Sequence, residues 1–158
     1  IYIKTSSSQV DTALQAVQLY ESNNNLPVLI TNIDTILLGR DFMKINNYLK
    51  DSDGIIDTFR AYDKAYSYIM TNDNNEVINI KEKIQISDTA SSGLYGFNSS
   101  NEFLKITKRL INKVINFSEL YQIMISEGRN IKAIHNELSN NTKVVGTPSQ
   151  YLDYIASE

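Results

Sequence analysis

Apolar residues recur at helical spacing, about three to four positions apart, in five stretches of the chain. Capping residues precede three of these stretches: serines at 6–8, Ser99 with Glu102 three positions later, and Thr147 followed by Pro148. We therefore expect amphipathic helices over 10–20, 42–49, 103–114, 118–127 and 151–155. In the last of these, Tyr151, Leu152 and Ile155 are expected to form the buried stripe.

Shorter apolar or β-branched runs between turn-forming residues predict strands at 1–4, 26–31, 54–59, 66–71, 76–80, 94–97 and 131–135. The run 26–31 is apolar at almost every position, which is typical of a central strand buried on both faces. Strands alternate with helices early in the chain and cluster later. This order predicts an α/β fold, with a sheet of mixed strands flanked by helices in a single domain over 1–158.

Composition then narrows the range of functions. Hydrophobic residues make up 42% of the 158 positions and charged residues 21%, as in an ordinary globular domain. A net charge of −3 without a long basic run argues against nucleic acid as a partner. The chain has no cysteine and one histidine, so disulfides, thiolate metal sites and paired imidazoles are excluded. No apolar run is long enough to span a membrane, and we expect a cytoplasmic protein.

Asn32, Ile33 and Asp34 directly follow the apolar run 26–31. Open α/β sheets bind ligands at the carboxyl ends of their strands, where Asp34 is well placed to hold a hard divalent cation. An Asx turn that ends the strand accounts for the same residues without any ligand. The pattern alone leaves both interpretations open.

A second group of candidates comes from two later strand ends. Glu82 and Lys83 follow the strand 76–80, where a lysine is able to reach a phosphate and a carboxylate to accept hydrogen bonds from sugar hydroxyls. Gly93, before the next strand, would allow a ligand to approach the backbone. The alternative is a solvated stretch of charges at 81–83. The chain has no second histidine or cysteine and no nucleophile-elbow glycine pattern, so His135 is interpreted as a hydrogen-bonded structural histidine.

Three ordered segments resemble the bacterial sugar-1-phosphate nucleotidyltransferases, in particular the branch that serves capsule and surface-polysaccharide pathways. The first joins Asp11-Thr12-Ala13-Leu14 to Leu26-Pro27-Val28-Leu29-Ile30-Thr31-Asn32-Ile33-Asp34, which is similar to the family's helix and the strand that ends in its metal aspartate. The second runs from Asp53-Gly54 through Tyr66-Ser67-Tyr68 and Ile80-Lys81-Glu82-Lys83 to Phe97. The third comprises Glu119-Leu120-Tyr121, Gly128-Arg129-Asn130-Ile131 and Gly146-Thr147-Pro148.

The resemblance implies a Rossmann-like domain that joins a nucleoside triphosphate to a sugar 1-phosphate, making a nucleotide-sugar. By position in the family pattern, Asp34 would be catalytic and hold Mg²⁺, and Lys83 would bind the sugar phosphate and position it for attack. Glu82 and the backbone near Gly93 would contact sugar hydroxyls, and Ser67 lies where relatives often carry a sugar-binding glycine.

This sequence departs from the family pattern in ways that bear on activity. The glycine-rich loop that cradles the triphosphate is missing, so the fold is expected to be N-terminally incomplete. Ser8 stands at a common glycine, and Val144 stands where many relatives carry a second metal aspartate. A metal-dependent glycosyltransferase of similar fold and an inactive sugar-phosphate-binding or regulatory subunit therefore remain alternatives. Oligomeric state also stays open, with a homo-oligomer among the alternatives.

Overall fold

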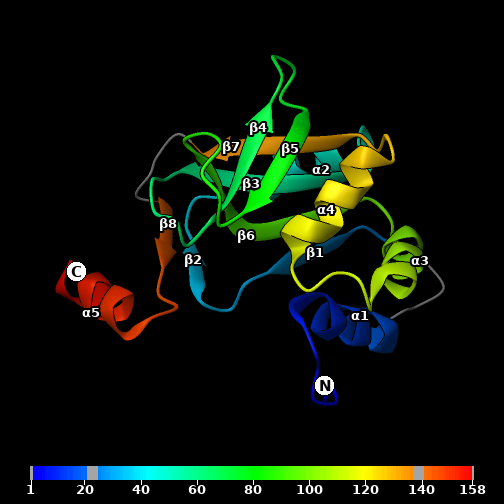
Figure 1. Cartoon of the computed structure of the whole chain (residues 1–158), viewed down its shortest axis with the longest axis horizontal. Coiled ribbons are helices and arrows are strands. Elements are labelled where there is room, and N and C mark those ends of the chain that lie inside the picture. The colour runs from blue at the N-terminus through cyan, green and yellow to red at the C-terminus, as the bar shows by residue number, and fades with distance from the viewer. Residues whose placement is uncertain (1, 21–24, 137–140, 158) are drawn as a thin grey trace.

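The computed structural model describes residues 2–20, 25–136 and 141–157 as helices, strands and connecting loops (Figure 1). In chain order the elements are α1 (Gln9–Tyr20), β1 (Val28–Thr31), β2 (Thr35–Leu37), α2 (Phe42–Lys50), β3 (Gly54–Arg60), β4 (Ser67–Thr71), β5 (Val77–Glu82), β6 (Thr89–Phe97), α3 (Ser100–Leu110), α4 (Phe117–Ser126), β7 (Ile131–Asn136), β8 (Thr142–Val144) and α5 (Pro148–Ala156). None of the helices in these ranges is long and apolar enough to cross a membrane.

Six strands form one mixed sheet in which β5, β4, β6, β3 and β7 follow one another and β1 joins β6. The β3–β7 pair is parallel, whereas the other pairs of this sheet are antiparallel. One edge of the long strand β6 pairs with β3. The opposite edge is shared, because β4 pairs with it at Ala90 and β1 pairs with it over 94–97. The strand β6 therefore joins the two halves of the sheet.

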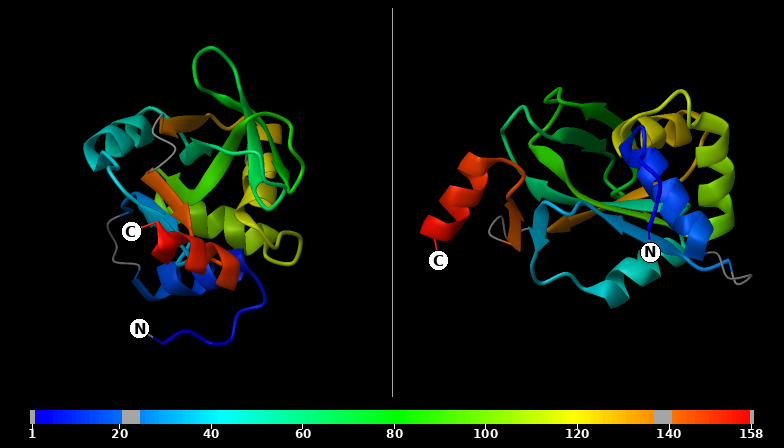
Figure 2. Two further views of the ribbon diagram at one scale, coloured as in Figure 1. Left: turned by 90° about the vertical axis from the view of Figure 1, so that its left-hand side faces the viewer. Right: turned by 90° about the horizontal axis from the view of Figure 1, so that it is seen from below.

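Helices cover both faces of the sheet, as Figure 2 shows. Alternating residues of β3 and β6 enter different cores, since Ile56 and Tyr95 pack with α1, α3 and α4 while Ile55 and Leu94 pack with α2. This alternation follows from the period of two along a strand. The predicted α/β class, with a mixed sheet flanked by helices, is confirmed.

The prediction that 26–31 is a central strand buried on both faces is wrong. The strand β1 alternates between half-buried and exposed positions, with Leu29 39% exposed, and it pairs only with β6 among the described residues. Its apolar residues led to this error, because an uncovered apolar strand and a covered one have the same composition.

Two further predictions at the chain ends are wrong. Residues 2–4 form no strand, and Tyr2 is fully exposed. Thr147 caps helix α5 with the predicted capping box, but the helix has no buried residue, and the expected stripe at Tyr151, Leu152 and Ile155 is exposed. A helical stripe indicates amphipathicity and does not show that another element covers it.

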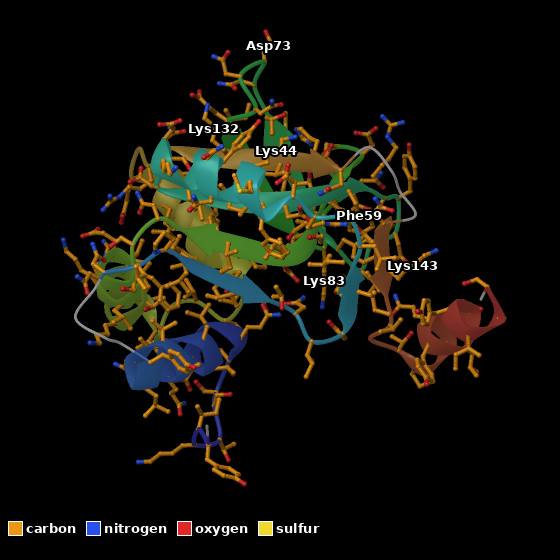
Figure 3. The ribbon with its side chains drawn as sticks, turned by 180° about the vertical axis from the view of Figure 1, so that it is seen from behind. Lys44, Phe59, Asp73, Lys83, Lys132 and Lys143 are labelled. Carbon is orange, nitrogen blue, oxygen red and sulfur yellow. The ribbon has the colours of Figure 1, made fainter. Side chains whose placement is uncertain are left out.

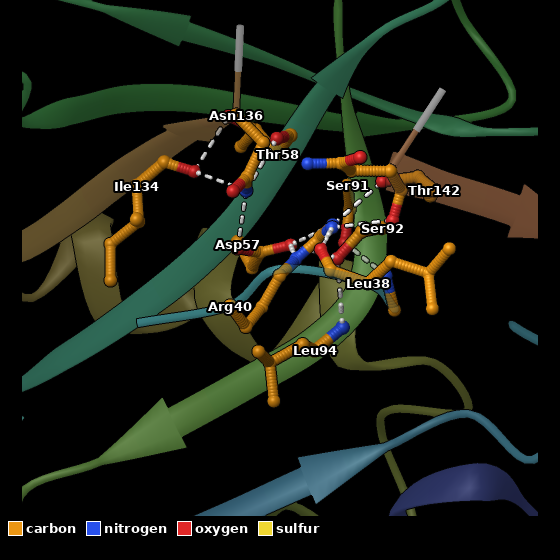
Figure 4. A network of polar contacts seen from close by, with 12 residues as sticks. Leu38, Arg40, Asp57, Thr58, Ser91, Ser92, Leu94, Ile134, Asn136 and Thr142 are labelled. Carbon is orange, nitrogen blue, oxygen red and sulfur yellow. Dashed lines mark hydrogen bonds and ion pairs between the residues drawn. The ribbon is translucent and has the colours of Figure 1, made fainter. Parts of the chain in front are cut away.

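The short strands β2 and β8, which the sequence pattern did not reveal, form a separate two-stranded ribbon. A buried ion pair between Arg40 and Asp57 attaches this ribbon to the main sheet (Figure 4). The guanidinium contacts the Asp57 carboxylate at 2.8 Å, the Thr142 hydroxyl at 2.6 Å and the carbonyl oxygens of Leu38 and Asn141. The pair therefore connects β3 to both strands of the ribbon.

We expect Asp57→Asn to lower the free energy of unfolding by about 3–5 kcal/mol, because it leaves the Arg40 guanidinium buried without a counter-charge. The side chains of Arg40 and Asp57 are 2% and 0% exposed. The double variant Arg40→Met/Asp57→Asn is expected to lose less than the sum of its two single changes. Urea unfolding followed by circular dichroism measures each value.

The exposed pair Arg60–Asp88 provides the control, since its side chains are 70% and 47% exposed. Asp88→Asn should change the unfolding free energy by less than about 1 kcal/mol. Equal losses of unfolding free energy in Asp57→Asn and Asp88→Asn would show that breaking the buried Arg40–Asp57 pair costs no more than breaking an exposed pair.

Candidate functional site

The candidate site is built around a bulge in β6. Ile56 of β3 pairs with Tyr95 and Thr58 pairs with Ser91, so Asp57 alone faces the three residues 92–94. The Ser92 hydroxyl donates to the Asp57 carboxylate at 2.6 Å, and the Ser91 hydroxyl accepts from the Gly93 amide at 3.2 Å. The two serine hydroxyls thus provide hydrogen bonds where the bulge interrupts the ladder between β3 and β6.

Gly93 has a φ of +85°, and its backbone lies directly against Asn32. A Cβ atom at this position would stand 2.7 Å from the Asn32 side-chain nitrogen. The backbone amide of Asn32 donates a hydrogen bond to the Gly93 carbonyl at 3.0 Å. Glycine is thus required twice here, by the left-handed backbone and by the close contact. The bulge is also where the shared edge of β6 changes its partner from β4 to β1.

Asp34 lies just beyond Asn32, immediately before β2, and its side chain is exposed. Its carbonyl accepts a hydrogen bond from the Val145 amide at 2.8 Å. Its carboxylate lies over Gly146, where a Cβ atom would stand 2.5 Å from Oδ2. Gly146 therefore leaves the space that the Asp34 carboxylate occupies, a role that the sequence interpretation missed.

Ser67 and Glu82 lie on the other side of the bulge. The register of β4 with β6 places Ser67 beside Ser91, and the register of β4 with β5 places Glu82 opposite Ser67. Glu82 Oε2 accepts hydrogen bonds from the hydroxyls of Ser67 and Ser118, the latter at 2.7 Å. Among the hydrogen bonds of the described residues, Oε1 of this half-buried carboxylate accepts none, so it is free to accept one from a ligand.

Lys83 directly follows β5 and has a φ of +55°, and its backbone amide donates a hydrogen bond to the Tyr66 carbonyl. Its side chain is exposed and makes no ion pair within the described ranges. Figure 3 shows Lys83 on the side of the molecule where β2 and β8 lie. Its ammonium group is thus available to an anion.

Val144 connects the two sides. Its backbone pairs with Thr35, next to Asp34, while its side chain packs against the buried cluster of Phe59, Ala61, Tyr68 and Ala90. Asp34 follows β1, which pairs with β6, and Lys83 follows β5, which β4 separates from β6. Neither is buried in a closed ion pair, which is the arrangement that would have excluded a ligand.

A hollow of about 960 Å³ reaches Asn32 and Asp34 at one end, but Lys83, Glu82 and Ser67 do not line it. The structure therefore does not enclose the two sides of the candidate site in this hollow. No group of three or more potential metal ligands occurs in the parts of the chain that the structure describes. A lone exposed carboxylate still suits Mg²⁺, which commonly takes one or two protein carboxylates together with waters and substrate phosphates.

Tyr95 supports the floor of the site from the core below it. Its ring stacks on Phe117 and Tyr121 at centroid distances of 4.9 and 5.5 Å. Burial raises the pKa of the Tyr95 hydroxyl to about 12, and hydrogen bonding to Ser91 and Ser67 opposes that rise. Tyr95 and Ser118 thus join the candidate site, and the sequence interpretation gave neither residue a role there.

No family model and no curated protein matches the sequence. Among solved structures, the crystal structure of the nucleoside-diphosphate-sugar pyrophosphorylase from Vibrio cholerae RC9 is similar, with a TM-score of 0.80 at 23% identity. The similarity covers 99% of this chain and 67% of that chain. It shows that this chain has the Rossmann-like α/β fold of that pyrophosphorylase.

Gly93→Ala is expected to lower the free energy of unfolding by about 1–3 kcal/mol, because the added Cβ strains the backbone and contacts Asn32. Gly128→Ala is the matched control, since Gly128 has a φ of +78° with no atom within 4 Å of the added Cβ. Urea unfolding compares the two variants, and the excess loss at Gly93 measures the contact. Equal losses would mean that Asn32 moves away freely.

Stability above pH 10 should depend on Tyr95. Because its folded-state pKa of about 12 lies above the unfolded value near 10, the stabilisation is complete below pH 10 and is lost between pH 10 and 12. We expect Tyr95→Phe to flatten the fall in unfolding free energy over that range, as urea unfolding at successive pH values would record. An unchanged slope would assign the fall to other tyrosines, such as Tyr121, whose pKa burial also raises.

Proposed function

We propose that this chain provides the sugar-phosphate and metal sites of a nucleotidyltransferase, which joins a nucleoside triphosphate to a sugar 1-phosphate. The product would be a nucleotide-sugar for surface-polysaccharide synthesis in the cytoplasm. The observation that carries the proposal is the β6 bulge, around which Asn32 and Asp34 stand on one side and Ser67, Glu82 and Lys83 on the other. The fold shared with a nucleoside-diphosphate-sugar pyrophosphorylase supports it.

In the proposed reaction, an oxygen of the sugar 1-phosphate attacks the α-phosphorus of the triphosphate. A new P–O bond forms, the bond between the α-phosphorus and its bridging oxygen breaks, and pyrophosphate leaves with that electron pair. Both reactants are anions, so their mutual repulsion must be screened. Mg²⁺ held by Asp34 would supply that screening.

The residues on the other side of the bulge would bind the sugar phosphate. The exposed ammonium group of Lys83 would contact the phosphate and orient it for in-line attack. Glu82 Oε1 would accept a hydrogen bond from a sugar hydroxyl, while Ser67 and Ser118 hold the other carboxylate oxygen in place. The β6 backbone near Gly93 would contact sugar hydroxyls beside the Asn32 side chain, which already lies against Gly93.

One observation favours binding without catalysis. The side chain of Val144 packs in an apolar cluster, so no second carboxylate faces Asp34 from β8. A chain that keeps Lys83 and Glu82 would bind a sugar phosphate even where it does not turn it over. Binding and turnover are therefore measured separately.

Titration calorimetry with glucose 1-phosphate and other hexose 1-phosphates, with and without Mg²⁺, tests the proposal. Lys83→Ala should weaken binding at least about tenfold, because it removes a charge-assisted contact to phosphate. Lys108→Ala, which removes an exposed lysine on α3, is the control and should bind as the wild type does. Binding that is unaffected by Lys83→Ala would refute the phosphate role.

The metal role of Asp34 has its own test. Mn²⁺ serves as a probe for Mg²⁺, and its binding is read by water-proton relaxation in the presence of the sugar phosphate and a nucleoside triphosphate. Asp34→Asn should weaken the bound Mn²⁺ signal at least about tenfold, because it removes the ligand charge. An equal signal in both proteins would show that the Asp34 carboxylate does not bind the metal and that Asp34 has only a structural role in the turn. Detection of pyrophosphate release then separates a transferase from a binding protein.

A further inference from the structure

Ser118 contacts the candidate sugar site from a helix, whereas the other residues on that side of the site belong to β4 and β5 or directly follow them. It is the second residue of α4 and is only 2% exposed. Its hydroxyl donates a hydrogen bond to Glu82 Oε2 at 2.7 Å. A buried hydroxyl requires a partner, and here that partner is a group that the sugar would contact.

A second donor reaches the same oxygen from a different element. Ser67 of β4 lies opposite Glu82 in the sheet register, and its hydroxyl also donates to Oε2. Because two donors meet on one oxygen, rotation of the carboxylate is restricted and Oε1 keeps a fixed direction. An acceptor that is fixed before the ligand arrives loses little side-chain entropy on binding, and it accepts a donor at one position only.

A neighbouring contact attaches the same face of α4 to β5. Gln122 Oε1 accepts a hydrogen bond from the Ile80 backbone amide at 3.1 Å. Ser118 and Gln122 are four residues apart on one helix, so their side chains lie on the same face. Both hydrogen bonds hold α4 against β5, but only the bond from Ser118 ends on a candidate ligand-binding group. The two contacts therefore separate the support of the helix from the orientation of Glu82.

We propose that Ser118 is a positioning residue that sets the sugar selectivity of the site. By fixing Glu82, it makes the site prefer sugar 1-phosphates that offer a free hydroxyl to Oε1 over those in which this hydroxyl is absent. The inference rests on the proposed function and adds the class of sugar that the site distinguishes. A site built to bond a hydroxyl rejects a ligand that lacks it, because the buried polar group is then left without a partner.

NMR titration of the isotope-labelled chain tests this role, with the amide shifts of Glu82 and Lys83 as the signal. The ligands are the 1-phosphates of glucose, galactose and mannose, the monodeoxy analogues of whichever binds most tightly, and inorganic phosphate. Ser118→Ala should weaken binding of the parent sugar phosphate by about three- to tenfold, because the ligand must then order the Glu82 side chain. The loss should be smaller for the analogue that lacks the contacted hydroxyl. Inorganic phosphate, which carries no sugar hydroxyl, should bind both proteins equally.

Two further variants separate positioning from a general loosening of α4. Gln122→Ala removes the adjacent contact to β5 and leaves Ser118 in place, so it should bind the sugar phosphate as the wild type does. Ser118→Thr keeps the hydroxyl and should restore most of the affinity that Ser118→Ala loses. Urea unfolding of each variant establishes that the compared chains are folded.

Several results would overturn the role of Ser118. These are equal binding of the parent sugar phosphate by the wild type and Ser118→Ala, an equal loss for the parent, every deoxy analogue and inorganic phosphate, and a loss in Gln122→Ala or Ser118→Thr as large as that in Ser118→Ala. A wild-type chain that binds none of the hexose 1-phosphates would instead refute the proposed function, and this inference would fall with it.

Discussion

The buried ion pair between Arg40 and Asp57 is the interaction on which the candidate site depends. A charge inside a protein is costly unless all its hydrogen-bonding groups find partners. Arg40 meets this condition through Asp57, Thr142 and two carbonyl oxygens, and Asp57 through Arg40, Ser92 and Asn136. The pair thus joins β3 to the bulge, to β7 and to the β2–β8 ribbon. It holds the strand that follows Asp34 and the strand that precedes Gly146.

Local patterns were sufficient for most of the fold. Helices α1 to α4 and strands β3, β4, β5 and β7 lie where hydrophobic spacing and capping residues predicted them. Apart from the strand expected at 1–4 and the unpredicted strands β2 and β8, the errors concern the surroundings of an element and not its type. The residues of β1 are those of a strand, but its burial depends on neighbours that no local pattern contains, and the same holds for the exposed stripe of α5.

The candidate site was less accessible to sequence interpretation, because its contacts join distant positions. Arg40 and Thr142 are 102 residues apart, and the Asp34 carboxylate lies over Gly146. Three-residue strands such as β2 and β8 are too short to give a period. Gly93 was singled out as a place where a ligand could approach the backbone, but the role of Ser91-Ser92-Gly93 as a bulge opposite Asp57 follows only from the register of β3 with β6. The resemblance to nucleotidyltransferases pointed to Asp34, Lys83, Glu82, Ser67 and Gly93, and their ligand roles stay predictions.

The shared edge of β6 has a consequence for how such a protein diversifies. Because β1 and β4 attach to one continuous strand, the separation between the Asp34 side and the Lys83 side is set by the residues of β6 between them. Insertions in the loops that connect the other strands leave this separation unchanged. Adding or deleting a residue in the bulge alters it by about 3 Å and reverses the direction of every following side chain of β6. Loop variation therefore preserves the spacing of the two sides, whereas the bulge must keep its length to preserve it.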